Sequence, residues 1–471
     1  MSQALNKNHG QVASAGLILL CCTLASLSLF GGSSRVDEPL LLFARVGAII
    51  GVCVAWVLLS RDQLRVVRTP LLFMLALAIM ITAQLVPLPP AIWQALPGMD
   101  EVVAASRLAG TMENWRPLSL APAATFNSLM SLLPATAMIL CYALLEERHR
   151  KSLPIIIVVI AALSVVVAGL QVGGISQLYH YRITNMSVPT GLMANRNHQA
   201  LLLAFSIPAI AAIAMNRTRG AVPQMSDLLV SGLAFVVVLA MMVSTGSRAG
   251  LLLAVVATGL AAFYVWSLLK GGAKRQGSPS RLVNIGGAAV LLGAFAIIAA
   301  AMGSGGNSFT RLGEVEVEGD QRMQVIPQLI ELSQKFFPFG SGFGSFPDVF
   351  QIIEPDDQLN TAYFNNAHND FAQVIIEGGV VGAAIVIVGL VIGVRASLRL
   401  VRVIRTRSRK TSGAEVGLLL VAVGTFITSV IASLFDYPLR TPLIGGLLAL
   451  AGCIVCDRRL NAGPVVKDIV R

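Results

Sequence analysis

The sequence has few charged residues for its length. Only 13% of its 471 residues are Asp, Glu, Lys or Arg, about half the share that soluble globular domains carry. This shortage of polar surface excludes an ordinary soluble enzyme. Runs of about 20 apolar residues recur along the whole chain instead, and each is long enough to cross a bilayer as a helix. We therefore predict an all-α integral membrane protein.

Motifs of several common site classes are also missing. No predicted strand precedes the glycine-rich stretch Gly340–Phe346 and no P-loop lysine follows it, so nucleotide binding is not indicated. His368, Asp370 and Glu377 could approach a metal ion, but no H-E-x-x-H motif or second clustered histidine supports such a site. The six cysteines lie in apolar runs or at their edges, where they act as small apolar residues.

The net charge of +11 is distributed as in a membrane protein rather than a nucleic-acid-binding protein. Basic residues occur in short tracts between the apolar runs, and about two thirds of them fall on one side if successive runs alternate across the bilayer. That side, which includes both termini, is predicted to be cytoplasmic. The basic tract 395–410 most simply binds anionic membrane lipids. We predict no nucleic-acid partner.

The apolar runs predict about twelve transmembrane helices. The longest polar interval, 302–371, separates the ninth from the tenth and falls on the outer side, so we divide the chain into 1–301, this large loop, and 372–471. Apolar residues at helical spacing between Met323 and Phe337 predict an interfacial helix inside the loop. The predicted spans are 12–31, 39–60, 70–88, 123–145, 153–172, 198–215, 227–244, 249–269, 283–303, 375–394, 415–435 and 441–456.

Two polar segments open predicted helices on the outer side. Asn195-Arg-Asn-His198 precedes the sixth span, and Asn365-Asn-Ala-His-Asn-Asp370 precedes the tenth. Such groups are costly at a membrane boundary and are usually functional, although asparagines can also simply cap a helix. His368 is our candidate for the catalytic base, because imidazole is the usual side chain in that role and is a poor helix cap. The predicted supporting residues are Asn195, Arg196, Asn197, Asn366, Asn369, Asp370 and Glu377.

Arginines on the outer side are the predicted anion-binding groups. Arg248 follows Ser244-Thr-Gly-Ser247, whose small residues leave backbone N–H groups accessible. Snorkelling of Arg248 to the interface is the alternative explanation. Arg311 and Arg322 lie in the large loop. With His368, these arginines predict base-assisted attack on a phosphorylated substrate, in which they stabilise the charge of a leaving diphosphate.

At these residues the sequence resembles the O-antigen ligase and O-antigen polymerase superfamily of bacterial inner-membrane glycosyltransferases. One family pattern is an arginine followed after three residues by leucine, present as Arg248-Ala-Gly-Leu-Leu252. A second is the histidine followed by glycine in the form His-Asn-Asp…Glu-Gly-Gly, present from His368 to Gly379. A third is an arginine upstream of a Gly-x-Gly-x-x-x-Phe stretch, which Arg322 and 340–346 supply.

The resemblance covers roughly residues 185–440 and implies a GT-C-like fold with its active face toward the periplasm. It implies a donor glycan on undecaprenyl diphosphate, and transfer without a metal ion or other cofactor. The acceptor would be another glycan, lipid A-core or a protein hydroxyl.

By the same resemblance, Arg248 and Arg322, or Arg311, would hold the diphosphate. His368 would activate the acceptor hydroxyl or position the donor, and Gly379 joins the supporting residues. A twelve-span secondary transporter and a non-catalytic protein of polymer assembly remain alternatives, but transporters place their binding groups at the bilayer midplane.

Overall fold

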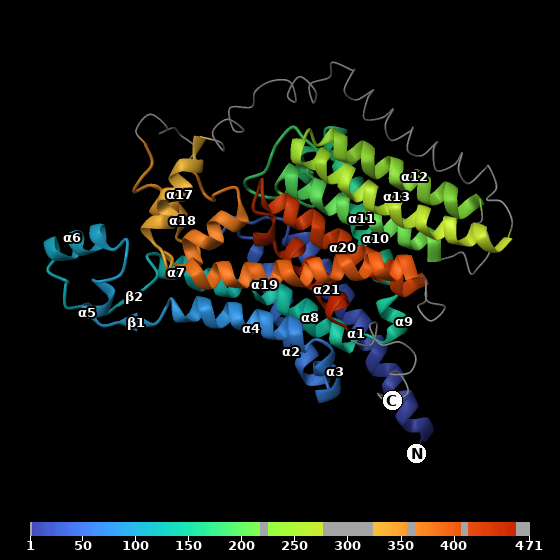
Figure 1. Cartoon of the computed structure of the whole chain (residues 1–471), viewed down its shortest axis with the longest axis horizontal. Coiled ribbons are helices and arrows are strands. Elements are labelled where there is room, and N and C mark those ends of the chain that lie inside the picture. The colour runs from blue at the N-terminus through green and yellow to red at the C-terminus, as the bar shows by residue number, and fades with distance from the viewer. Residues whose placement is uncertain (1, 217–224, 277–323, 356–363, 407–412, 458–471) are drawn as a thin grey trace.

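The computed structural model describes residues 2–216, 225–276, 324–355, 364–406 and 413–457 and is mostly helical (Figure 1). Within these residues, eight helices are long and apolar enough to cross a membrane. Shorter apolar helices cover Ser14–Phe30, Arg68–Ala83 and Pro442–Cys456. These segments correspond to every predicted span except 283–303, which lies outside the described residues. The helical membrane fold agrees with the prediction, and the count of twelve spans stays a prediction.

The elements follow one another along the chain with short connections. The first half contains α1 (Ser2–Phe30), α2 (Leu41–Leu58), α3 (Arg61–Val66), α4 (Arg68–Ala83), β1 (Pro87–Leu88), α5 (Pro90–Trp93), α6 (Asp100–Leu108), β2 (Arg116–Pro117), α7 (Pro122–Met130), α8 (Leu133–Leu144), α9 (Glu147–Arg150), α10 (Leu153–Val172), the 3₁₀ turn η1 (Ser176–Leu178) and α11 (Arg196–Asn216). The second half contains α12 (Met225–Ser244), α13 (Arg248–Gln276), α17 (Ile326–Lys335), α18 (Phe346–Phe350), α19 (Asp370–Thr406), α20 (Gly413–Ser433), the 3₁₀ turn η3 (Pro438–Arg440) and α21 (Pro442–Cys456).

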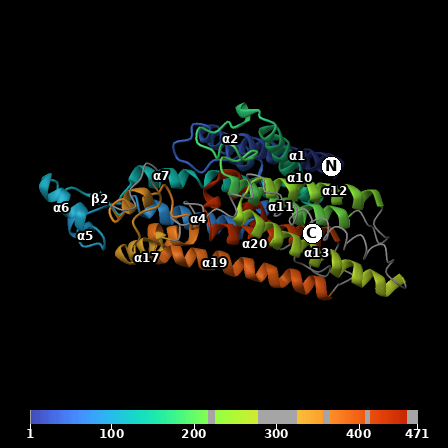
Figure 2. The same cartoon turned by 90° about the horizontal axis from the view of Figure 1, so that it is seen from above.

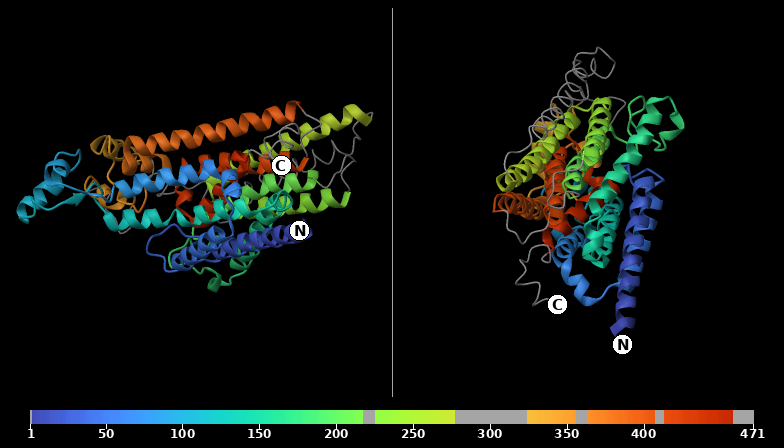
Figure 3. Two further views of the ribbon diagram at one scale, coloured as in Figure 1. Left: turned by 90° about the horizontal axis from the view of Figure 1, so that it is seen from below. Right: turned by 90° about the vertical axis from the view of Figure 1, so that its right-hand side faces the viewer.

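Helices α11 and α20 pack against each other at the centre of the bundle. Residues 198–212 of α11 and 415–425 of α20 are all buried, as expected for helices that are apolar all round. Gly424 allows the close approach, because a Cβ there would lie 2.6 Å from Cγ of Pro208 on α11. Around this pair, α19 runs along one side of the bundle, and α1 and α2 lie on the opposite side (Figures 2 and 3).

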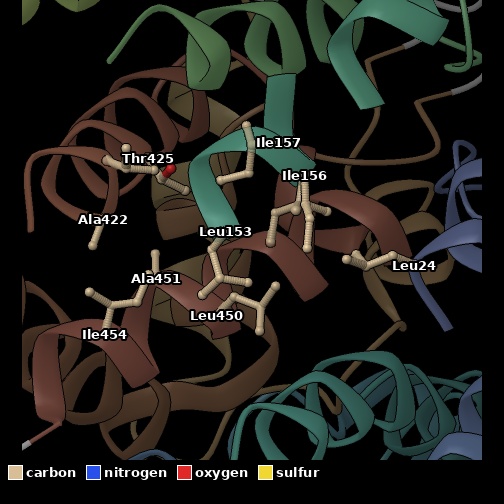
Figure 4. Close-up of a pocket in the computed structure, with 11 residues that line it drawn as sticks. Leu24, Leu153, Ile156, Ile157, Ala422, Thr425, Leu450, Ala451 and Ile454 are labelled. Atoms are coloured by element: carbon tan, nitrogen blue, oxygen red, sulfur yellow. The ribbon is translucent and has the colours of Figure 1, made fainter. Parts of the chain in front are cut away.

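The interior of the bundle is closely packed between α1, α10, α20 and α21. A cavity of only about 10 Å³ remains there, lined by residues such as Leu24, Leu153, Thr425 and Leu450 (Figure 4). A space of that size is at the lower limit for one water molecule, and its apolar lining offers water few hydrogen bonds. This part of the structure therefore acts as a rigid scaffold.

The outside of the bundle carries large apolar side chains. Their exposure in the isolated chain is what a helix bundle surrounded by lipid requires, since hydrocarbon solvates them better than water does. Examples from four helices are Trp56 at 66% exposure, Val57 at 82%, Leu233 at 66%, Val255 at 63% and Leu398 at 61%.

Smaller elements cover one end of the bundle. The strands β1 and β2 pair antiparallel and carry α5 and α6 outward, and α17 and α18 pack on the start of α19 (Figure 1). Helix α17 lies within the interval 323–337 predicted to be helical, with Pro327 in its first turn, where proline is tolerated. Lys335 Nζ contacts Glu101 Oε1 of α6 at 2.6 Å. Residues 302–323 and 356–363 of the predicted loop lie outside the described residues.

We expect Gly424→Leu to destabilise the protein by about 1–3 kcal/mol, because the added side chain collides with Pro208. Gly259→Leu on α13 is the matched control, since a Cβ there meets nothing within 4 Å. Thermal unfolding of both purified variants in detergent measures the difference. Equal melting temperatures would contradict the close contact of α11 with α20.

Candidate functional site

The candidate site lies where several helix starts and one turn meet. The starts are those of α11, α13 and α19, and the turn is 434–441, which joins α20 to α21. Polar side chains from these segments form two groups, the Asp436 cluster and the Arg440 cluster. Both groups are at the end of the bundle that carries α17 and α18.

The Asp436 cluster consists of Asp436, Asn195, Asn197, His198 and His368. Asp436 has only 2% of its side chain exposed. Its Oδ2 accepts hydrogen bonds from Nδ2 of Asn197 at 2.7 Å and of Asn195 at 3.3 Å. Nδ1 of His368 lies 3.4 Å from Oδ1, and Nε2 of His198 lies 3.9 Å from Oδ2. One buried carboxylate therefore joins two histidines and two amides from α11 and from the segment before α19.

His368 is held in an unusual backbone conformation. Its φ of +49° lies in the left-handed region, which costs a residue with a Cβ about 1–2 kcal/mol. The imidazole packs edge-on against the ring of Tyr437, with 4.9 Å between ring centroids, and more distantly against Phe364. About 18% of its side chain remains exposed. Strain of this kind persists where surrounding contacts fix a residue, and it is common at functional sites.

The turn that carries Arg248 is connected to this cluster by Ser247. The Ser247 hydroxyl donates a hydrogen bond to Oδ1 of Asn197 at 2.7 Å and accepts one from the backbone N–H of Gly250 at 2.8 Å. Ser247 therefore caps α13 and ties its start to α11. The exposed side chain of Arg248 follows directly. A continuous path, Ser247–Asn197–Asp436–His368, links the predicted anion-binding residue to the predicted base.

The Arg440 cluster consists of Arg440, Glu377, Asp370, Gln373 and Ser433. Nη2 of Arg440 lies 2.9 Å from Oε2 of the fully buried Glu377, and its Nε lies 4.0 Å from Oδ1 of Asp370. Gln373 donates to Oε1 of Glu377 at 2.9 Å, and Ser433 donates to Oδ2 of Asp370 at 2.9 Å. Burial disfavours the charged guanidinium, but Glu377 and Asp370 outweigh it and raise the pKa of Arg440.

Gly379 shapes α19 where the loop 338–343 crosses it. Its φ of +56° and ψ of −146° are not helical, so α19 is kinked there. A Cβ on Gly379 would overlap the carbonyl of Pro338, which accepts a hydrogen bond from the N–H of Val380 at 2.9 Å. Gln84 bridges α19 and the loop 338–343. Its side chain donates a hydrogen bond to the carbonyl of Glu377 at 2.8 Å and accepts one from the N–H of Phe343 at 3.0 Å. The role of Gly379 is therefore to let the backbone of the loop 338–343 pack directly on the backbone of α19.

Some predicted supporting residues mainly cap helices. Oδ1 of Asn369 accepts from the N–H groups of Phe371 and Ala372, each at 3.0 Å, so it is the N-cap of α19. Asn195 caps α11 in addition to contacting Asp436, since its Oδ1 accepts from the N–H of Asn197 at 2.7 Å.

Two further predicted residues lie beside these groups. Asn366 is buried and accepts from Gln373 Nε2 at 3.3 Å. Arg196 is half-buried, and its N–H donates to Oδ1 of Asn185 at 3.0 Å. Arg311 and Arg322 lie outside the described residues. In the part of the chain that the structure describes, no three His, Cys, Asp or Glu side chains are placed to share a metal ion.

The sequence-based prediction missed two important residues, Asp436 and Arg440, and it gave no role to His198, which ends the first polar segment. Asp436 and Arg440 lie in the short connection between the last two predicted spans, and His198 begins the sixth. The signal that could have identified them is the general one for ionisable groups at a membrane boundary. That criterion was applied to the two polar segments and to Arg248, but not to the connection 434–441.

Comparison with protein families identifies part of the chain. Residues 233–387 match the family model described as O-antigen ligase. These residues are similar to that family, and we call them the O-antigen ligase segment. The resemblance found from the sequence motifs is thereby confirmed. A comparison with curated proteins finds no match to the chain.

The O-antigen ligase segment contains only part of the candidate site. Arg248, His368 and Glu377 lie within it. Asn197, Asp436 and Arg440 lie outside it, although Asn197 bonds to Ser247, Asp436 contacts His368 and Arg440 pairs with Glu377. The histidine of the O-antigen ligase segment is therefore positioned by helices that precede and follow the segment in the chain.

We expect Arg440→Met to lower the free energy of unfolding by about 3 kcal/mol, because it leaves the buried Glu377 without its cation. Adding Glu377→Met should recover a large part of the loss, since the uncompensated charge is then removed. Chemical denaturation of the two single variants and the double variant, set up as a double-mutant cycle, measures the coupling. If the double variant loses the sum of the two single losses in free energy of unfolding, the ion pair contributes nothing to stability.

Proposed function

We propose that the protein transfers a glycan from undecaprenyl diphosphate to a hydroxyl group of another glycan or of lipid A-core, at the periplasmic face of a bacterial inner membrane. The observation that carries the proposal is the contact between Nδ1 of His368 and the buried carboxylate of Asp436, within and beside a segment of the O-antigen ligase family. The exposed Arg248 at the start of α13 supports an anionic donor.

The histidine and the aspartate suit general-base catalysis. A carboxylate facing Nδ1 favours the tautomer that carries its proton there, and this leaves the lone pair on Nε2. Nε2 of His368 then takes the proton of the acceptor hydroxyl. The hydroxyl oxygen forms a bond to the anomeric carbon of the donor glycan. The bond from that carbon to the diphosphate oxygen breaks, and undecaprenyl diphosphate leaves with the electron pair.

Arg248 is suited to hold the diphosphate. It is the first residue of α13, where the helix dipole favours an anion. Its guanidinium can bind two phosphate oxygens at once and so stabilise the charge that develops on the leaving group. Arg322 or Arg311 would supply the second cation. Arg440 is engaged by Glu377 and Asp370 and is assigned to the support of the site.

The arrangement favours transfer over transport. The polar groups of the candidate site come from helix starts and from the turn 434–441. Secondary transporters bind their substrates near the bilayer midplane, commonly at breaks within membrane helices.

We expect His368→Ala to lower the rate of glycan transfer by about 10²–10⁴-fold, which is the usual contribution of a general base. Asp436→Asn should also lower the rate, because an amide does not favour the same imidazole tautomer. The measurement is transfer from purified lipid-linked glycan to acceptor, at equal amounts of folded protein. The exposed His180 provides the control variant His180→Ala, which should retain activity. Wild-type transfer by His368→Ala would refute the proposal.

We expect Arg248→Lys to lower kcat/KM for the donor by about tenfold or more, because lysine keeps the charge but loses the planar fork that binds phosphate through two hydrogen bonds. Arg107→Lys on the exposed surface of α6 is the matched control. Initial rates over a range of donor concentrations measure the change. A wild-type value for Arg248→Lys would argue against specific binding of the diphosphate by this residue.

A further inference from the structure

Helix α2 carries one charged residue, Arg45, inside a segment that is long and apolar enough to span a membrane. Arg45 lies in the second turn of the helix, about 6 Å from its first residue, Leu41. The loop before α2 shows which end of the bundle this is. In that loop the carbonyl of Gly32 accepts a hydrogen bond from the N–H of Ala194, in the segment that leads into the Asp436 cluster. Arg45 is therefore about one turn below the end of the bundle that carries the candidate site.

The guanidinium of Arg45 contacts a neutral side chain rather than a carboxylate. Its Nη2 donates a hydrogen bond to Oδ1 of Asn127 on α7 at 2.5 Å. Asn127 is in the second turn of another candidate span, Pro122–Leu144, and so lies at a similar depth. Among the residues that the structure describes, no Asp or Glu carboxylate pairs with Arg45. An amide accepts a hydrogen bond from the cation but does not neutralise it, so the charge is only partly compensated.

The pair of Arg45 and Asn127 offers hydrogen-bond donors to a ligand. Oδ1 of Asn127 is engaged by Arg45, which leaves the Nδ2 group as a donor. The guanidinium has further N–H donors and no acceptor. Within the described part of the chain the two side chains make no other hydrogen bond, and both are half-buried. N–H donors beside one positive charge suit the oxygens of an anion, and a guanidinium matches phosphate through two hydrogen bonds.

The surroundings of the pair select an anion that belongs to a lipid. Leu42 and Ile49 share the face of α2 that carries Arg45, at i−3 and i+4, and are exposed at 63% and 44%. Phe126, next to Asn127, is exposed at 54%. In a membrane these side chains contact hydrocarbon. A soluble anion would have to leave water to reach them, which is costly, whereas a lipid already carries its phosphate beside its acyl chains.

We propose that Arg45 and Asn127 bind the phosphate of a membrane lipid, in the leaflet on the side of the candidate site. This lipid site shares no residue with the Asp436 cluster or the Arg440 cluster. It lies on α2, on the side of the bundle opposite α19 (Figure 3). An anionic phospholipid and the lipid A part of an acceptor both carry the required group. The proposal does not depend on which reaction the candidate site catalyses.

A purely structural bridge between α2 and α7 is the competing explanation, and Asn127→Asp separates the two. A carboxylate at this position turns the contact with Arg45 into an ion pair, so the bridge is kept. The same carboxylate neutralises the guanidinium and repels a phosphate. Asn127→Asp should therefore weaken lipid binding about tenfold or more without lowering the melting temperature. Arg45→Met, which removes the cation, should weaken lipid binding as well.

The measurement is native mass spectrometry of the purified full-length protein, titrated with phosphatidylglycerol and with diacylglycerol of the same acyl chains. The wild type should bind phosphatidylglycerol more tightly, because only that lipid carries a phosphate. Asn114→Asp in the exposed connection between α6 and β2 is the matched control for the added charge and should bind like the wild type. Equal binding of phosphatidylglycerol by Asn127→Asp and Asn114→Asp would overturn the proposal. Asn127→Asp decides the question even if Arg45→Met does not fold.

Competition identifies the source of the phosphate. If bisphosphorylated lipid A displaces phosphatidylglycerol at equal or lower concentration, the lipid site belongs to the acceptor. If it does not, the lipid site belongs to a bilayer phospholipid. Displacement by inorganic phosphate at the same concentration would overturn the assignment to a lipid, because the acyl chains would then contribute nothing to binding.

Discussion

The buried carboxylate of Asp436 is the interaction on which the site end of the bundle depends. An ionised group in a low-dielectric interior is costly unless hydrogen-bond donors and cations surround it. Asp436 accepts hydrogen bonds from Asn195 and Asn197 at the start of α11, and Nδ1 of His368, before α19, lies 3.4 Å from its carboxylate. Satisfying this one group therefore requires segments that are distant in sequence to converge at the turn 434–441.

The same turn joins the polar site to the apolar interior. Arg440 binds Glu377 on α19, and the kink at Gly379 lets the loop 338–343 pack against the carbonyl of Glu377. Directly beyond, α21 lines an apolar cavity of about 320 Å³. A substrate that combined a charged head group with a hydrocarbon tail would need this juxtaposition, since the two parts require opposite surroundings within a short distance.

The O-antigen ligase segment, 233–387, contributes the start of α13 and the histidine before α19, but the helices that hold them in place lie largely outside it. The central pair α11 and α20 illustrates this: α11 precedes the segment, α20 follows it, and Gly424 and Pro208 set their separation. The scaffold thus fixes the geometry, while the family segment supplies Arg248 and His368. A small change in packing between α11 and α20 would move Asn197 relative to Asp436.

The sequence by itself determined the features that depend on local pattern. Apolar runs of membrane-spanning length predicted the positions of the long helices, and helical spacing after Met323 predicted α17. Polar and ionisable side chains at the starts of helices indicated Arg248 and His368 as site residues. Only the tertiary structure showed that Asn369 caps α19 whereas Asn197 faces Asp436, although both are asparagines at helix starts. It also decided the pairing of Arg440 with Glu377 and the existence of the cavity. Such contacts join residues far apart in sequence, and local periodicity carries no information about which distant helix faces which.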